Sequence, residues 1–245
     1  MVLLVFFLKV EVNPTGIIAL RALPQSKMRN ALRYIPPSTL IGAIAYPLFH
    51  IKGERKETLM ERKNPKSAAD TLRGIFLWTT IKMSGKSKAY GSILKINRLH
   101  RGSVESAITS LPFTVMYGER DYSMSIVYLL KEEAISASSY SLKDFERAAW
   151  GISRLGSRES VVSVESVESG RVEIHEADEA RTSYAFPFTG KEVEGRGALQ
   201  AVFDWRKGIG SYSNTSFIVM FYPEEEVTVR GALKVVSLDG EEVVL

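Results

Sequence analysis

The sequence predicts an α+β fold, in which two helices cover one face of an antiparallel sheet. Three observations support this prediction. Strand-like and helix-like segments alternate over the first 170 of the 245 residues, a basic stretch with several glycines interrupts them near residue 85, and short alternating apolar runs follow residue 170. With 45% hydrophobic residues, the chain has enough apolar material to bury a core.

The first third of the chain predicts two strands separated by a helix. Residues 2–12 form the first strand, which ends at Asn13-Pro14 because proline donates no ladder hydrogen bond. A basic loop over 21–34 follows. Residues 52–73 are charged and are expected to be a surface excursion, and the apolar run 74–83 predicts the second core strand.

The segment YIPPSTLIGAIAYPLF predicts the first helix. Pro37 fits its first turn, where a missing N–H costs nothing, and Ser38 or Thr39 is expected to cap it. Pro47 should end or kink the helix near Tyr46, because proline disfavours the helical conformation of its predecessor.

The middle of the chain predicts an arm, a strand, a helix and a further strand. The arm, about 82–122, contains glycines and many cations and is expected to be a protruding hairpin or loop. Residues 123–130 predict the third strand. Residues 141–153 predict a helix with Ser141 as its N-cap and an aspartate in its first turn, and the valine run from Val161 predicts the fourth strand.

This order of elements is that of a ferredoxin-like or RRM-like sheet with both helices on one face. We therefore expect an RRM-like domain over residues 1–170 that carries the inserted arm. Residues 171–245 consist of short alternating runs between Gly, Asn and Pro, which predict a β-rich C-terminal portion.

Charge is unevenly distributed along the chain. Residues 1–110 contain 18 Lys and Arg against 6 Asp and Glu, whereas residues 111–245 contain 14 against 22. The first part is therefore the expected side for a polyanion, although a solvated basic face would have the same composition.

Several kinds of chemistry have no support in the sequence. The chain has no cysteine, which excludes disulfides and thiolate metal sites and fits a reducing cytoplasm. Its three histidines are isolated, and no metal-ligand, nucleotide-hydrolysis or acyl-transfer motif is present. The opening MVLLVFFLKV is too short for a membrane span. We expect no metal, cofactor, small-molecule substrate or membrane partner.

Phosphate binding is the remaining chemistry, and its strongest candidate is the turn after the second helix. Gly156 is expected to adopt a left-handed or otherwise tight conformation with amides turned outward, flanked by Arg154, Ser157 and Arg158. The alternative is a Schellman-type helix end, whose arginines neutralise carbonyls or pair with Glu159. Spacing alone does not separate these two interpretations.

Two further regions are candidate RNA contacts. The helix start at Ser38 and Thr39 offers free amides to an anion, although ordinary capping would explain the same residues. The arm mixes cations with an aromatic residue that suits stacking on a base, although a merely solvated loop would look similar. With the basic loop, these regions add the candidate residues Arg29, Arg33, Lys86, Lys88, Tyr90, Lys95, Arg98 and Arg101.

Two motifs resemble a known family. The passages YIPPSTLIGAIAY and AAWGISRLGSRESVVSVESVE resemble the signature regions of the fifth CRISPR-associated (Cas) protein family, the RAMP-superfamily subunit of type I Cascade complexes. The second passage is most similar to the archaeal subtype I-A branch. The resemblance covers about the first 170 residues.

This resemblance implies an RRM-like domain with a thumb-like arm and a β-rich C-terminal part. It also implies a non-catalytic role in CRISPR interference, namely capping the 5′ handle of the CRISPR RNA beside the backbone and large subunits of Cascade. By analogy the 154–158 turn lies near the handle, and the arm lies across the guide RNA. A scaffold that contacts only protein subunits is an alternative.

An enzymatic alternative also follows from the resemblance, because one branch of the family cuts precursor RNA without a metal. Tyr90, Lys95, His100 and Tyr117 are the residues that such a metal-independent endoribonuclease would use here. No spacing ties them together, so we expect a binding subunit and not an enzyme.

Overall fold

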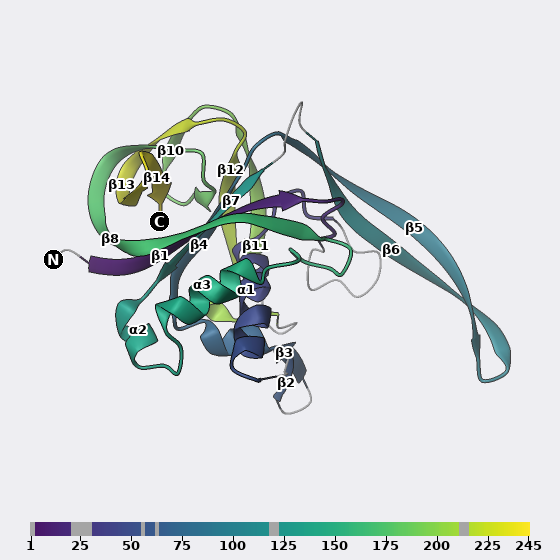
Figure 1. The fold of residues 1–245 in the computed structure, drawn as a ribbon. Coiled ribbons are helices and arrows are strands. Elements are labelled where there is room, and N and C mark those ends of the chain that lie inside the picture. Colours follow the sequence, from purple (N-terminus) through teal and green to yellow (C-terminus); the bar gives the residue numbers. More distant parts are fainter. Residues whose placement is uncertain (1–2, 21–30, 55–56, 62–63, 118–122, 211–215) are drawn as a thin grey trace.

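The computed structural model describes residues 3–20, 31–54, 57–61, 64–117, 123–210 and 216–245. The fold is α+β, as the sequence predicts, with antiparallel sheets and few helices (Figure 1). Arg29 and most of the expected basic loop lie outside the described residues.

The main sheet has the strand order β10-β13-β8-β1-β7-β4, with β14 paired to β13, and its pairs are antiparallel. The strand β1 pairs with β7 on one side and with β8 on the other. The strands of this sheet are β1 (Leu3–Pro14), β4 (Phe76–Met83), β7 (Met124–Leu130), β8 (Val162–Thr182), β10 (Glu192–Glu194), β13 (Val227–Leu238) and β14 (Glu241–Val244).

The strand β8 joins the two expected portions of the chain. It runs for 21 residues, pairing with β1 along its first part and with β13 along its last part. The boundary expected at 170/171 therefore falls inside a strand. Gly170 at this point pairs with Phe7, and a Cβ on Gly170 would lie 2.8 Å from the Phe7 ring.

Two helices pack against each other beneath this sheet, α1 (Pro37–Ile51) and α3 (Leu142–Trp150), and α2 (Glu132–Ser136) is a short helical turn (Figure 1). The N-cap of α3 is Ser141, as predicted. Its side chain accepts a hydrogen bond from the Asp144 amide, and the Asp144 carboxylate accepts one from the Ser141 amide.

The expected end of α1 near Tyr46 is wrong, because the helix continues through Pro47 to Ile51. Proline removes one donor from the helix, and tertiary packing compensates for that loss here. The buried Pro47 ring lies against Gly151 at the end of α3, where a Cβ would come within 2.8 Å of the Pro47 Cβ.

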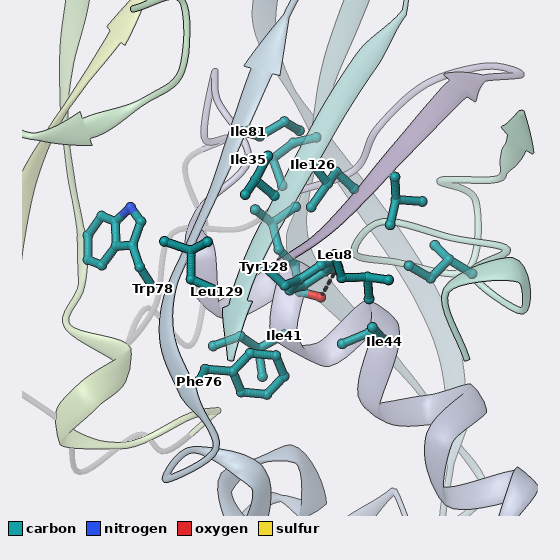
Figure 2. Close-up of a cluster of buried hydrophobic side chains, with 14 of the residues drawn as sticks. Leu8, Ile35, Ile41, Ile44, Phe76, Trp78, Ile81, Ile126, Tyr128 and Leu129 are labelled. Atoms are coloured by element: carbon teal, nitrogen blue, oxygen red, sulfur yellow. Dashed lines mark hydrogen bonds between the residues drawn. The ribbon is translucent and has the colours of Figure 1, made fainter. Parts of the chain in front are cut away.

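The core lies between α1 and the strands β1, β4 and β7. Leu8, Ile41, Ile44 and Tyr128 are fully buried there (Figure 2). The Tyr128 hydroxyl donates to the Leu40 carbonyl at 2.9 Å, which satisfies the polar atom that this ring takes into the core. The same core cluster includes residues after 182, so it extends across both expected portions of the chain.

The arm is a long two-stranded hairpin that projects away from the body (Figure 1). Its strands β5 (Lys86–His100) and β6 (Ser103–Tyr117) pair with each other over their full length. The remaining elements are β2 (Thr58–Glu61), β3 (Asn64–Ser67), the 3₁₀ turns η1 (Ala68–Leu72) and η2 (Trp205–Lys207), and the sheet β11-β12-β9, formed by β9 (Phe186–Pro187), β11 (Gly197–Phe203) and β12 (Phe217–Pro223).

None of the helices in the described part of the chain is long and apolar enough to cross a membrane.

Candidate nucleic-acid interface

The 153–162 turn is a tight reversal between α3 and β8. The amide of Val162 donates to the Ser153 carbonyl at 3.0 Å. Gly156 has a φ of +104°, which confirms the predicted tight conformation. The Schellman alternative is wrong, because α3 already ends at Trp150 with Gly151 as its C-cap. Gly156 therefore belongs to a separate turn.

This turn is docked onto the chain segment that follows β1. The Ser160 hydroxyl accepts a hydrogen bond from the Ala19 amide at 2.7 Å, and the Ser157 amide donates to the Ala19 carbonyl at 3.3 Å. The Leu155 amide donates to the Ser160 carbonyl at 2.9 Å. The expected outward-facing amides are therefore wrong for Leu155 and Ser157, because both donate within the protein.

A pocket of about 630 Å³ opens between this turn and one face of α1. It brings together two of the predicted anion sites, since Thr39 lines it from the helix and Arg154, Gly156, Ser157 and Arg158 line it from the turn. The other lining residues are Ala19, Leu20, Gly42, Ala43, Ala45, Tyr46, Phe49, Glu57, Ser67, Ala69, Gly151, Ser153 and Glu159.

The two arginines of the pocket differ in their partners. The Arg154 guanidinium lies 4.9 Å from the centre of the Tyr46 ring and makes a long ion pair of 3.8 Å with the Glu57 carboxylate. Arg158 is exposed, and its side chain makes no ion pair or hydrogen bond with the described residues. Arg158 is therefore the more available cation for an external anion.

Carboxylates limit the positive charge of the pocket. Glu57 reaches Arg154 from the segment before β2, and the Glu159 carboxylate accepts a hydrogen bond from the Ser157 hydroxyl. The lining thus contains two arginines and two glutamates. An anion bound here would depend on the geometry of the arginines and not on a large excess of positive charge.

The start of α1 differs from the prediction. Its N-cap is Pro36, no side chain caps it, and Ser38 and Thr39 are the second and third helical residues. The expected capping role of these two residues is therefore wrong. The Thr39 amide donates to the Pro36 carbonyl at 2.9 Å, which removes one of the amides expected to receive an anion.

The predicted arm residues lie outside the pocket. Lys86, Lys88, Tyr90, Lys95 and Arg98 are spread along β5, so they follow the length of the hairpin and do not gather at one point. Arg101 and Gly102 form the two-residue turn at the tip, with φ values of 49° and 80°. Lys88, Tyr90 and Arg101 are exposed.

Arg33 makes structural contacts at the base of the arm. Its Nε donates to the Ser87 carbonyl at 3.0 Å, and its Nη2 lies 2.9 Å from the Glu224 carboxylate after β12. The guanidinium also stacks on Tyr34, whose ring lies 4.6 Å from that of Tyr222. Burial raises the pKa of the Tyr34 hydroxyl, and the Arg33 charge opposes this effect. Arg33 therefore connects the arm to the β11-β12-β9 sheet.

Sequence reasoning missed two residues that shape the pocket. Tyr46 lies seven residues after Thr39, which places both on one face of α1, so helical spacing could have indicated it. Glu57 precedes a short hairpin and carries no sequence signal that links it to Arg154.

Within the described ranges, no group of three or more His, Cys, Asp or Glu residues is arranged to hold a metal ion.

Solved structures provide the comparison with known proteins. A crystal structure of a CRISPR protein from Archaeoglobus fulgidus aligns over 98% of this chain and 98% of that chain, with 20% sequence identity and a TM-score of 0.64. A chain of the Type III-B Cmr-beta, bound to cognate target RNA and AMPPnP, aligns over 90% of this chain and 86% of that chain, with 10% identity and a TM-score of 0.41. No protein-family model and no curated protein matches the sequence. The first likeness shows that this chain has the fold of the Archaeoglobus fulgidus CRISPR protein over nearly the full length of both.

Proposed function

We propose that this chain is a non-catalytic RNA-binding subunit of a type I CRISPR Cascade complex, of the subtype I-A kind, and that it caps the 5′ handle of the CRISPR RNA. The backbone and large subunits are its proposed protein partners. The two sequence motifs support this role, and so does the fold shared with a CRISPR protein. The order β8-β1-β7-β4, with α1 and α3 packed together, supports the ferredoxin-like interpretation of the first portion.

One observation carries the RNA-binding proposal. The turn at Gly156 presents Arg158 at the rim of a pocket large enough for a nucleotide, without a partner among the described residues. A phosphate at this position would accept charge-assisted hydrogen bonds from the guanidinium. The arm provides the proposed second contact, which follows the RNA backbone through Lys88 and Arg101.

The test is Arg158→Ala in the full chain reconstituted with the backbone subunit. We expect it to weaken binding of repeat-derived 5′ handle RNA by about 1–3 kcal/mol. Arg230→Ala is the matched control, because it removes the same charge from the distant strand β13, where Arg230 pairs with Glu179 and Glu194. Equal affinities for the two variants, with both folded, would contradict the proposed site.

The enzymatic alternative makes a separate prediction. Tyr90 and His100 are ten residues apart on β5, about 33 Å at 3.3 Å per residue, so they are too far apart to act on one 2′-hydroxyl. We expect no product when the protein is incubated with repeat RNA and EDTA. A discrete cut at the 5′ boundary of the handle would overturn the non-catalytic assignment.

A further inference from the structure

Gly42 in the middle of α1 has no packing reason to be glycine. Glycine is unfavourable inside a helix because its backbone loses the most freedom on folding. A Cβ at Gly42 would have none of the described heavy atoms within 4 Å, apart from its own neighbours and helix backbone. Gly151 differs, because the Pro47 ring occupies the space that its Cβ would take.

Gly42 lies on the wall of the pocket, between Thr39 and Tyr46 on the same face of α1. Its neighbour Ala43 also lines the pocket, so α1 presents two small residues in a row before the larger Tyr46. Backbone without a Cβ is where a planar group can approach most closely. The missing side chain therefore leaves space for a flat ring.

The turn side of the pocket carries the cationic groups. Arg154, Ser157, Arg158 and Glu159 line it there, with the Arg154 guanidinium over the Tyr46 ring, whereas Gly42 and Ala43 line it from α1. A nucleotide has the matching arrangement, with a planar, largely apolar base at one end and a phosphate at the other. A volume of about 630 Å³ accommodates a ligand of this size.

We infer that this pocket holds one unpaired nucleotide of the bound RNA, with its base flat against α1 at Gly42 and its phosphate at Arg158. This inference rests on the proposed function and adds to it a fixed base position. Phosphate contacts alone would hold any strand, whereas an inserted base sets the register of the RNA on the protein. The glycine at position 42 is then a requirement of the ligand and not of the fold.

Gly42→Leu tests this inference, because it fills the space left by the missing side chain while improving helix propensity. We expect the variant to unfold at a temperature no lower than the wild type and to bind 5′ handle RNA at least about fivefold more weakly, the lower end of what one stacked base contributes. Gly42→Ala, which adds a single methyl group, should have a smaller effect.

An abasic scan of the handle RNA gives a second measurement that requires no variant. One abasic position should weaken binding to the wild type by at least about fivefold, and the same position should have no further effect in Gly42→Leu. An unchanged affinity of Gly42→Leu, or an abasic scan without a sensitive position, would overturn the inference. If Arg158→Ala still weakened binding, the proposed function would stand without it. Failure of the wild type to bind handle RNA would overturn both.

Discussion

The 153–162 turn and the β5–β6 hairpin are both basic segments, but the fold holds them in different ways. Contacts distant in sequence fix the turn, through Ser157 and Ser160 on Ala19, and carboxylates offset its charge. The hairpin depends on its own strand pairing and meets the body near its base, at the Ile18–Thr114 bridge and at Arg33. The body of the protein therefore sets the position of the turn, whereas the outer part of the arm is held by the pairing of β5 with β6.

The largest expected effect comes from removing the tight turn itself. Gly156→Ala should destabilise the protein by about 3 kcal/mol, because it forces a side chain into positive φ and within 3.0 Å of the Ala19 carbonyl. Gly102→Ala at the hairpin tip is the matched control. Its φ is also positive but its surroundings are open, so a cost of about 1 kcal/mol is expected.

Denaturant unfolding of both variants measures this difference. Equal destabilisation of the two variants would show that the neighbours of the turn constrain it no more than the tip of the arm is constrained.

Shortening the arm should change RNA binding with little effect on the body. Replacing residues 92–111 with a short glycine turn removes Lys95, Arg98 and Arg101 but keeps the bridge and the Arg33 contact. The salt dependence of handle-RNA binding should decrease by about 0.7 in log K per log unit of salt for each lost phosphate contact. Thermal unfolding should change little. A collapse in stability would show that the arm supports the core.

Acid should weaken the contact between the end of α1 and the start of α3. The Lys52 ammonium lies 2.8 Å from the Asp144 carboxylate, and with the Ser141 hydrogen bonds it lowers the pKa of Asp144 from 3.8 to about 2, against the opposing effect of burial. The lowered pKa stabilises the folded state above about pH 4, and this contribution disappears as the pH falls towards 2.

Asp144→Asn should therefore cost about 1 kcal/mol at neutral pH, after allowance for solvent screening, and much less at pH 2. The comparison of wild type and variant by urea unfolding at the two pH values measures this change. If the two proteins differed in free energy of unfolding by the same amount at both pH values, the Lys52–Asp144 ion pair would not be the source of the difference.

The smallest expected effect has the opposite sign. Glu57→Gln removes the carboxylate that competes for Arg154, so it should tighten handle-RNA binding by about 0.5 kcal/mol. Glu133→Gln on α2 changes the net charge equally, away from the pocket, and is the control for long-range attraction. If Glu57→Gln increased the affinity for handle RNA no more than Glu133→Gln does, the Glu57 carboxylate would not compete with RNA for Arg154.

Local signals were sufficient where a feature depends on neighbouring residues. Ser141 and Asp144 are three residues apart, so the capping box could be predicted from their spacing. The position of Gly156 between a predicted helix and a predicted strand was enough to predict a tight turn there. The alternation of strands and helices likewise predicted the α+β class.

The remaining features depend on partners far away in the sequence. Pro47 stays within α1 because Gly151 makes room for its ring, and Gly170 stays within β8 because Phe7 packs over it. In the sequence Arg33 is one cation of a basic loop, and only the fold brings the Glu224 carboxylate next to it. No local pattern contains this information. The end of the first helix and the outward amides of the turn were therefore predicted wrongly, and the boundary expected at 170 falls inside the continuous strand β8.

The pairing of β1 with β8 has a consequence for synthesis of the protein on the ribosome. β1 ends at Pro14 and its partner strand β8 begins at Val162, so about 150 further residues must be synthesised before the two strands can pair. At 5–20 residues per second, this delay is roughly 7–30 s. During that time the edge of β1 that later pairs with β8 is open to wrong strand partners.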